Sequence, residues 1–564
     1  MKNLIFNLFM KTYRFLILNI IMCFLSFGCK KADNETLKVE NLDSFLKALS
    51  SKRMVNDVTT MSYKVVGAAY EWDEPSVLYV NPINTNNYTY LVKSNLDNRQ
   101  VSAQFTQFEI KQPFSYQTGG INIVINDKEG MISGEYDFKS YFLNMRYPQS
   151  LNASRIEAMI KNCQMTNPLF LAKLALQNNV KEIKDNRISI PTIVQGLYYV
   201  VEFDPISNLP LNCTIKESDF LKGDIEYKIQ YSDWRDIDGF NVPTKFHYYL
   251  GGRMFRSEQI SDISINPIFP KDIFKISGIQ SPVPYDTPNG WMGFIYSQWY
   301  NRWFDKGLLF DQPLNNGAWI LEDHDLTPYG LPNQTVGEHI KIIGRPDHSL
   351  YSVAIKTSKG IFLFEPTLNN FWTRSVLNAT KSKFPGQKIS GVIVSHTHSA
   401  IASGVREAAY ETQNVIIGKN GKSVIDEALA NEHHLNPDAL ALNPIPINVN
   451  EVGGKTILAE GELEIYYLGG DTADLGRHAN DMVIAYIPSY QTVIQSELMW
   501  NGPFKRVFVG QAANSYSDAS KQELKRRAQF LDKSIKKYNL KVKRIISVQG
   551  GLGSYDDLIN VINN

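Results

Sequence analysis

The sequence predicts an α+β protein of two main domains, the first rich in antiparallel strands and the second built from alternating strands and helices. The chain has 564 residues, which is enough for about two to four domains of ordinary size. Residues from about 40 to 280 contain short β-branched and aromatic runs separated by turns. Beyond about residue 320 the strand runs alternate with helical segments, which is typical of a mixed sheet covered by helices.

The composition excludes several classes of protein. Lys and Arg number 58 against 57 Asp and Glu, and this balance argues against a nucleic-acid partner bound through bulk positive charge. Apolar residues make up 43% of the chain, which is too many for a disordered protein. Four cysteines are too few for a disulfide scaffold or a cysteine-rich zinc module.

The first 28 residues have the pattern of a signal peptide. Lys11 and Arg14 precede an apolar run over residues 15–28, which is too short to span a bilayer comfortably. The run ends in Gly28-Cys29 and resembles the lipobox of bacterial lipoproteins, which implies acylation of Cys29. Residues 29–45 are then a lipidated tether, and Lys30 favours the outer membrane. An ordinary cleaved signal with an incidental cysteine is the alternative.

We therefore expect an exported outer-membrane lipoprotein, facing the periplasm or the cell surface and held to the membrane by its lipid anchor. Export would place Cys163 and Cys213 in an oxidising compartment, where they could pair or stay as buried free thiols.

Residues 46–280 form the predicted β-rich domain. A strand over residues 197–203 leads into a turn over residues 204–208 and returns through residues 211–215. Residues 225–231 alternate with a period of two, so that apolar side chains face one way. The main helical signal covers residues 155–177, and Pro168 is expected to break it.

Residues 209–276 resemble the last strands of the periplasmic lipoprotein-carrier family. The resemblance implies a half-barrel, in which a curved antiparallel sheet surrounds a helix and an apolar cavity for acyl chains. The alternative is a generic antiparallel domain used for docking. Prolines at 282 and 284 mark the end of this domain, and residues 281–334 form an aromatic-rich connecting segment.

Residues 335–564 contain the candidate metal ligands. The sequence predicts a hairpin over residues 351–364, a helix over residues 372–384 and a buried strand over residues 391–395. His396 and His398 follow this strand directly. Residues i and i+2 of an extended chain point the same way, so both imidazoles can face one metal ion. His478, before the strand 482–487, is the third candidate ligand.

These residues resemble the metallo-β-lactamase superfamily, whose first motif reads His-x-His-x-Asp-His. The resemblance covers residues 335–564 and implies an αββα sandwich with metal ions at one edge. His396, His398 and His478 match the three histidines of the first metal position. Ala400 and Ile401 replace the Asp and the last His of the motif, and Glu497 stands at the place of the bridging Asp.

The resemblance implies a site for one zinc ion on His396, His398 and His478, with a water molecule at the open position. Glu497 and Asp481 are our catalytic candidates to replace the missing Asp, and Asp471 and Asp474 are further acidic residues near the site. The implied function is zinc-dependent hydrolysis of a small-molecule or lipid substrate. The alternative is a non-catalytic envelope binding protein without metal, because the closing strand ends in Gln549-Gly550 where the family has its last His.

A basic segment over residues 521–537 could suggest nucleic-acid binding. Apolar residues at helical spacing, with Lys and Arg on the opposite face, instead predict a solvated amphipathic helix.

Overall fold

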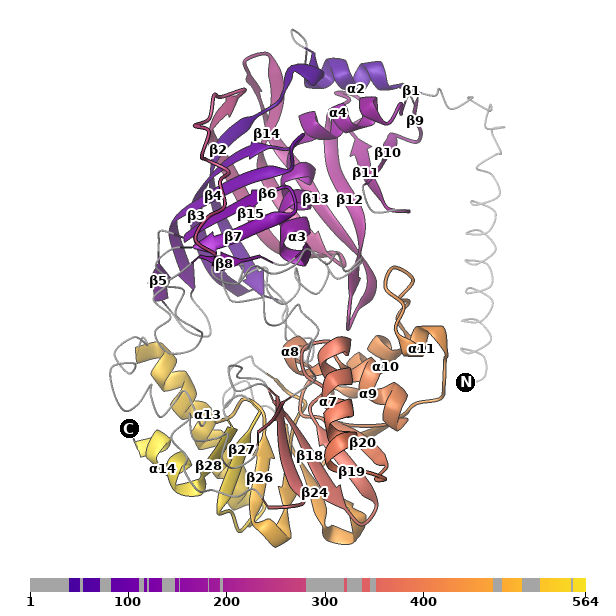
Figure 1. The fold of residues 1–564 in the computed structure, drawn as a ribbon, viewed down its shortest axis with the longest axis vertical. Coiled ribbons are helices and arrows are strands. Elements are labelled where there is room, and N and C mark those ends of the chain that lie inside the picture. The colour runs from indigo at the N-terminus through magenta and orange to yellow at the C-terminus, as the bar shows by residue number, and fades with distance from the viewer. Residues whose placement is uncertain are drawn as a thin grey trace, which may run out of the picture.

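The fold was analysed in a computed structural model, shown in Figure 1. The structure describes residues 40–50, 54–71, 83–110, 116–118, 121–133, 148–151, 153–180, 182–192, 196–279, 319–321, 337–344, 351–469, 479–499, 518–548 and 551–563. The predicted signal peptide, Cys29 and most of the segment 281–334 lie outside these residues. Among the described residues, no helix has both the length and the apolar character needed to cross a membrane.

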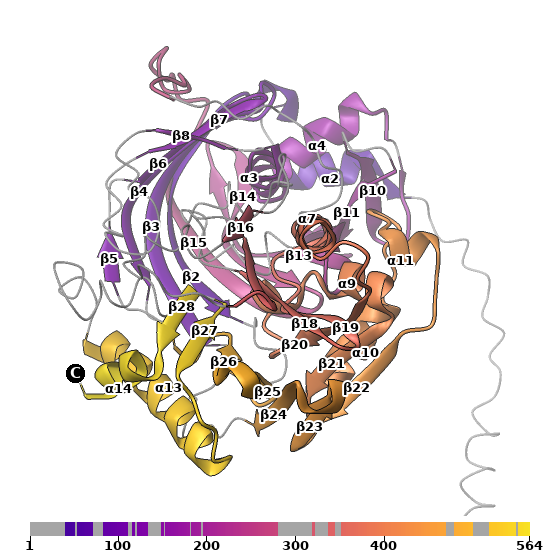
Figure 2. The same ribbon diagram turned by 60° about the horizontal axis from the view of Figure 1, so that its bottom comes forward.

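The N-terminal part of the chain forms one 13-stranded antiparallel sheet. It curves around the helix α3 (Ala153–Met165), as Figure 2 shows. In spatial order its strands are β10 (Arg187–Pro191), β11 (Tyr198–Phe203), β12 (Pro210–Asp219), β13 (Gly223–Ile237), β14 (Phe240–Leu250), β15 (Arg253–Ile265), β2 (Met61–Glu71), β3 (Ile83–Asn95), β4 (Gln100–Ile110), β6 (Ile121–Asn126), β7 (Glu129–Ser133) and β8 (Gln149–Ser150), with β5 (Tyr116–Thr118) paired to β4.

The predicted features of this region are confirmed at the level of single elements. Tyr227, Ile229 and Tyr231 of β13 are buried, in agreement with the period-two pattern. The helical signal is interrupted where it was expected, because α4 (Pro168–Gln177) starts at Pro168. The side chain of Asn167 accepts a hydrogen bond from the backbone N–H of Phe170 and so caps the new helix.

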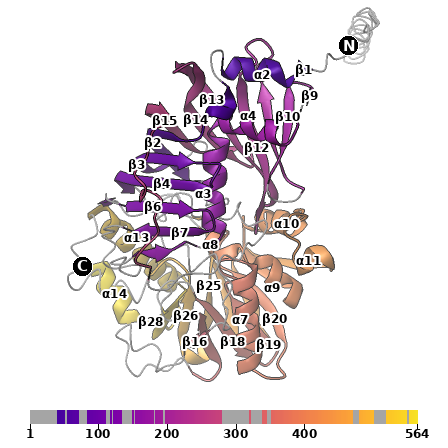
Figure 3. The ribbon, with the colours of Figure 1, turned by 45° about the horizontal axis from the view of Figure 1, so that its top comes forward.

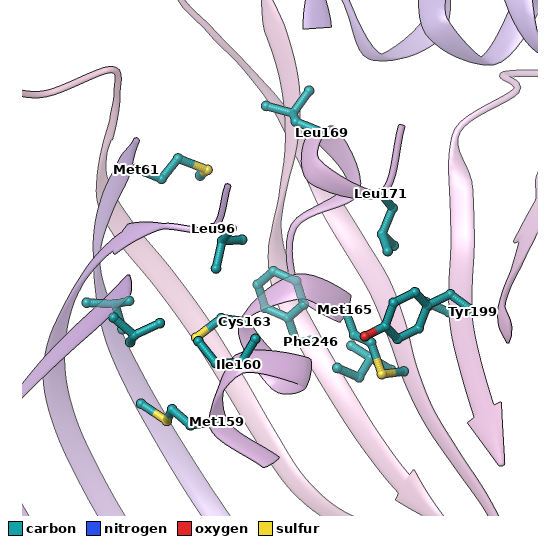
Figure 4. Packing of buried hydrophobic residues seen from close by; sticks show 14 of the residues in the cluster. Met61, Leu96, Met159, Ile160, Cys163, Met165, Leu169, Leu171, Tyr199 and Phe246 are labelled. Atoms are coloured by element: carbon teal, nitrogen blue, oxygen red, sulfur yellow. The ribbon is translucent and has the colours of Figure 1, made fainter. Parts of the chain in front are cut away.

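The concave side of the sheet is packed with side chains from α3 and α4. Figure 4 shows Met159, Ile160 and Cys163 of α3, Leu169 of α4 and Phe246 of β14, which all belong to one buried cluster. Both Cys163 and Cys213 are free thiols, and burial raises the pKa of Cys163 to about 12 and that of Cys213 further. They are therefore unreactive parts of the core.

The described chain begins at one end of this sheet. The short strand β1 (Glu40–Asn41) pairs with β9 (Glu182–Ile183), and α2 (Leu42–Leu49) follows at once. β1 and the first half of α2 fall within residues 29–45, the predicted tether, and the second half of α2 lies beyond it. Phe45 of α2 is fully buried, with its ring 4.8 Å from that of Phe203 on β11. This helix covers the end of the sheet marked by α2 in Figure 3.

A buried ion pair lies among aromatic side chains on this sheet. Arg256 and Glu258, both on β15, are bonded to each other and almost completely buried. The Glu258 carboxylate also accepts hydrogen bonds from the hydroxyls of Tyr88, Tyr90 and Tyr248. The negative charge of Glu258 is therefore balanced by Arg256 and by three hydroxyl hydrogen bonds. We expect removal of one member of the pair to leave an unpaired buried charge, which lowers the free energy of unfolding.

The C-terminal part of the chain forms two further sheets. The seven-stranded sheet has the order β16 (Trp319–Leu321), β17 (Ile340–Gly344), β18 (Ser352–Thr357), β19 (Gly360–Phe364), β20 (Ile389–Val394), β21 (Asn414–Gly418) and β22 (Asn448–Val452). The six-stranded sheet has the order β23 (Lys455–Leu458), β24 (Leu463–Gly469), β25 (Met482–Ile487), β26 (Thr492–Gln495), β27 (Arg544–Ser547) and β28 (Gly551–Ser554).

These two sheets pack face to face and carry helices on their outer faces. Ile355 and Phe362 of one sheet share a core with Ile465 and Val483 of the other. A second core lies under helices on the first sheet and a third lies under helices on the second, which gives the layers α, β, β and α seen in Figure 2. The outer helices are α7 (Asn370–Lys383), α9 (Val405–Thr412), α10 (Lys422–Ala430) and the short α11 (Ala439–Leu442) on one side, and α13 (Asp518–Lys537) and α14 (Tyr555–Asn563) on the other.

The large antiparallel sheet touches this sandwich through the turn between β12 and β13. The carboxylate of Asp224 accepts hydrogen bonds from the backbone N–H groups of His434 and Leu435, and the backbone N–H of Asp224 donates to Glu432. The ring of Phe220 packs against that of Phe371 on α7. The chain is thus a mixed α+β fold with separate hydrophobic cores, and its division into two domains stays a prediction.

The buried ion pair gives the first prediction. Glu258→Ala leaves the Arg256 guanidinium in an apolar surrounding, so we expect the free energy of unfolding to fall by about 3–5 kcal/mol in urea titrations. Gln259→Ala, at the next and exposed position, is the matched control. A loss below about 1 kcal/mol for Glu258→Ala would show that water reaches the guanidinium.

Candidate metal centre

The candidate site begins at the carboxyl end of β20. Parallel pairing with β19 and β21 buries this strand on both faces, and the chain leaves it at Ser395. His396, Thr397 and His398 follow, before the short helix α8 (Ser399–Ala402). The two imidazoles are tilted by 32° with their centroids 5.8 Å apart. They therefore face the same region from one short segment.

Glu497 approaches this region from the facing sheet, just after β26. The side chain of Gln495 fixes the turn that follows the strand, because its Oε1 accepts hydrogen bonds from the backbone N–H groups of Leu498 and Met499. Its Nε2 donates to the carbonyl of Met499. Glu497 is held inside this turn and is 3% exposed.

The two histidines and Glu497 form one cluster of ligand atoms. Nδ1 of His398 lies 3.0 Å from Oε1 of Glu497, and Nε2 of His396 lies 3.9 Å from Oε2. One donor atom from each residue lies within 4.8 Å of the others. His396 is fully buried, whereas the side chain of His398 is 14% exposed, so the cluster lies just below the surface.

These distances fit a metal ion. Zinc bonds to nitrogen and oxygen of about 2.1 Å place neighbouring ligand atoms of a tetrahedron about 3.4 Å apart. The two separations between imidazole and carboxylate lie on either side of this value. Two imidazoles and one carboxylate also form a donor set that zinc commonly takes.

His396 has a defined orientation. Its Nδ1 lies 2.8 Å from Oγ of Ser395, which leaves Nε2 on the side of Glu497. When Nδ1 carries the proton and donates to Ser395, the lone pair of Nε2 is directed toward the cluster. An outer hydrogen bond of this kind fixes the tautomer of a metal-binding histidine.

Asp481 is hydrogen-bonded to the backbone of the histidine segment. It is fully buried, and its Oδ2 accepts a hydrogen bond from the backbone N–H of Thr397, which lies between the two histidines. A Cβ at Gly421 would come within 2.5 Å of this oxygen, and one at Gly418 within 1.9 Å of the Asp481 carbonyl. Glycine at 421 therefore leaves room for the Asp481 carboxylate, and glycine at 418 leaves room for its backbone carbonyl.

Glu365 is a buried acid that sequence reasoning missed. It follows β19, the parallel neighbour of β20, and its carboxylate accepts a hydrogen bond from the backbone N–H of Ser395. Burial raises the pKa of Glu365 well above its usual range, and the charges of Glu497 and Asp481 raise it further. Its φ of +70° is strained for a residue with a side chain. The sequence did contain a signal for this residue, because Glu365 is an acidic residue directly after an apolar strand.

Arg527 corrects the interpretation of the basic helix. The segment forms α13, but Arg527 is 6% exposed and does not lie on a solvated face. Its Nη1 lies 3.6 Å from Oε2 of Glu497 and donates to the carbonyl of the same residue. Position 527 is three residues after Leu524 and four before Leu531, so helical spacing already places it on the buried side.

Several predicted residues lie outside the described part of the chain. These are His478, Asp471 and Asp474 before β25, and Gln549 and Gly550 between β27 and β28. The role of His478 as a ligand therefore stays a prediction. Ile401, which replaces the last His of the family motif, is fully buried in the sandwich core.

No protein-family model matches the chain, and no curated protein sequence matches it. Solved structures similar to it include the DIM-1 metallo-β-lactamase and TMB-1. Each is 14% identical, with a TM-score of 0.30, and the match covers 44% of this chain and 96% of that chain. DIM-1 exposed to ceftazidime matches with the same identity and TM-score. A TM-score this low does not establish a shared fold. The fold is therefore described from its sheet topology, and the candidate site from the distances between its residues.

The raised pKa of Glu365 predicts a pH dependence of stability. Below its unfolded pKa of about 4.5 the carboxyl is protonated in both states, and its stabilising contribution is fully present. Above that pH only the unfolded state ionises, so stability falls by about 1.4 kcal/mol per pH unit until the folded pKa is reached. In chelator-treated protein, the stability advantage of Glu365→Gln over the parent should therefore grow as the pH rises from about 5 toward neutral.

Urea unfolding at several pH values measures this difference, with Glu427→Gln on the exposed side of α10 as the control. A constant difference between Glu365→Gln and the parent across this range would contradict the prediction.

Proposed function

We propose that this chain is a metal-dependent hydrolase with a site for one zinc ion. The observation that carries the proposal is the cluster of His396, His398 and Glu497, whose donor atoms lie within 4.8 Å of one another. His478 is proposed as a fourth ligand. A zinc ion held by this set lowers the pKa of a bound water to about 7 and so supplies hydroxide for hydrolysis.

We assign Glu497 to the metal as a ligand and not as a free base. Both of its oxygens lie beside positively polarised groups, because Oε1 faces His398 and Oε2 faces His396 and Arg527. Asp481 is proposed as a positioning residue, since its carboxylate holds the backbone of Thr397. Ser395 orients His396.

The charge of Arg527 supports a one-ion site. A second cation bound to Glu497 would lie close to the guanidinium, which is itself 6% exposed. Two unit charges of like sign about 4 Å apart repel each other by about 4 kcal/mol at the dielectric of a protein near its surface, and a divalent ion doubles this repulsion. The same guanidinium lies 3.6 Å from the Glu497 carboxylate and offsets its negative charge.

The location and substrate are also proposed. The apolar run before Cys29 supports export and acylation, and therefore a site in the bacterial envelope. The partly exposed His398 lets a substrate reach the cluster from the surface. The proposed substrate class is a small molecule or lipid with a hydrolysable ester, lactone or phosphoester bond.

Substitution of the cluster tests the metal. The chain from residue 30 onward, purified without chelators, should contain about one zinc ion by elemental mass spectrometry, and His396→Ala or Glu497→Ala should lower zinc affinity by about tenfold or more. His434→Ala, which removes a histidine that is 76% exposed, should leave zinc content unchanged. Equal zinc in all variants would place the ion elsewhere.

Turnover tests the hydrolase. We expect hydrolysis of at least one of p-nitrophenyl butyrate, γ-nonanolactone and bis(p-nitrophenyl) phosphate, lost after chelation and restored by added zinc. His398→Ala should lose activity, whereas His434→Ala should keep it. Zinc-loaded, folded protein without turnover of any of the three would favour the non-catalytic envelope binding protein instead.

A further inference from the structure

The three most exposed large apolar side chains among the described residues belong to turns next to α2 or η1 (Val55–Asp57). Ile268 is 99% exposed, Ile206 is 90% exposed and Met54 is 67% exposed. Single exposed apolar residues need no explanation on their own. These three residues are together called the apolar rim below.

Ile206 is presented by an ordered turn. Oδ1 of Asp204 accepts hydrogen bonds from the backbone N–H groups of Ile206 and Ser207 and from the Ser207 hydroxyl. Backbone bonds from Asp204 to Leu209 and from Asn208 to Asp204 close the loop between β11 and β12. The turn therefore holds the Ile206 side chain in the solvent. The hydrogen bonds of the turn do not involve this side chain, so a polar residue at position 206 would keep them.

Ile268 and Met54 flank a second ordered turn, η1 (Val55–Asp57). Oδ1 of Asn266 accepts a hydrogen bond from the backbone N–H of Thr59, and its Nδ2 donates to the carbonyl of Asp57. The Thr60 hydroxyl donates to the carbonyl of Pro267. The segment that carries Ile268 is thus fixed on η1, directly after Met54.

The helix α2 connects the two turns. Its residue Phe45 packs on Phe203, three residues before Ile206, and its C-terminal end leads to Met54. The strand β1, where the described chain begins, lies beside this helix in Figure 1. The apolar rim is therefore at the end at which residues 1–39 join the fold, opposite the αββα sandwich in Figure 3.

From this arrangement we infer that the apolar rim rests on the surface of a lipid bilayer, with Ile206, Ile268 and Met54 among the lipid chains. The inference rests on the proposed export and acylation, but it is independent of the metal site. The segment from Cys29 to Glu40 reaches about 40 Å at most when extended, so an acylated Cys29 keeps this end near the membrane.

The charges near the rim favour uncharged or zwitterionic lipids. The exposed side of α2 carries Asp43 and Lys47, η1 carries Asp57, and the turn of Ile206 carries Asp204. Lys271 and Asp272 follow Ile268, so both signs of charge are present near the rim. A basic cluster of the kind that binds anionic lipids is not found on the described residues of α2 and η1. Apolar insertion, with the anchor, would then set the orientation of the protein and direct the sandwich away from the bilayer.

Quenching by brominated phosphatidylcholine tests this orientation. The chain from residue 29 carries Cys29→Ser and is ligated through its N-terminus to a lipid in phosphatidylcholine vesicles. A fluorophore is attached in turn to Ile206→Cys, Ile268→Cys, Leu442→Cys and Ile457→Cys. The last two positions are matched controls on the sandwich, 66% and 59% exposed. The buried Cys163 and Cys213 stay unlabelled.

We expect brominated lipid to quench the fluorophores at positions 206 and 268 about twofold more than those at 442 and 457. Equal quenching at all four positions, or none at 206 and 268, would overturn the inference. A fluorescence change at 206 and 268 that needs no vesicles and grows with protein concentration would show pairing of two chains instead. The intact mass of full-length protein from membranes tests acylation of Cys29 separately, and zinc content tests the metal site.

Discussion

The candidate centre depends on one buried carboxylate. Glu497 is 3% exposed, and an isolated carboxylate at that depth would be costly to ionise. Its oxygens instead lie beside His398, His396 and Arg527. These three groups come from two elements far from Glu497 in the sequence, so the charge is balanced only when the complete sandwich has formed. The same closeness brings together three groups that could hold a metal ion.

The sandwich explains why these residues meet. His396 and His398 follow β20 of one sheet, and Glu497 follows β26 of the other. Each strand has a parallel neighbour, so its carboxyl end lies at an edge with polar turn residues and not in the middle of a hairpin. The two edges face each other across a shared apolar core. Backbone contacts between the sheets, such as the bond from Val483 to Ser395, fix their distance.

Local sequence patterns predicted much of this structure. Pro168 interrupts the helical signal because a proline can start a helix but cannot continue one, and β13 buries alternate side chains because strands have a period of two. The His-x-His spacing after a buried strand also indicated the edge at which Glu497 lies near the two histidines. In each case the deciding interaction lies within a few residues.

Other parts of the site depend on contacts between distant segments. Arg527 is 30 residues from Glu497 and was assigned to a solvated face, although its helical position places it inside. Glu365 reaches the histidine segment through the parallel pairing of β19 with β20, and Asp481 reaches it from the facing sheet. No local pattern specifies which acidic residue contacts the histidine segment, because this depends on the order of the strands and on how the two sheets pack. The need for glycine at 418 and 421 becomes clear only from the position of Asp481, with which a Cβ at either residue would collide.

The most direct test of this account is zinc-edge anomalous diffraction from crystals of the chain grown with zinc. The account predicts one strong anomalous peak bonded to Nε2 of His396, Nδ1 of His398 and one oxygen of Glu497. Zinc peaks only elsewhere in the molecule, or none near His396 under saturating zinc, would contradict the assignment of this cluster as the metal centre.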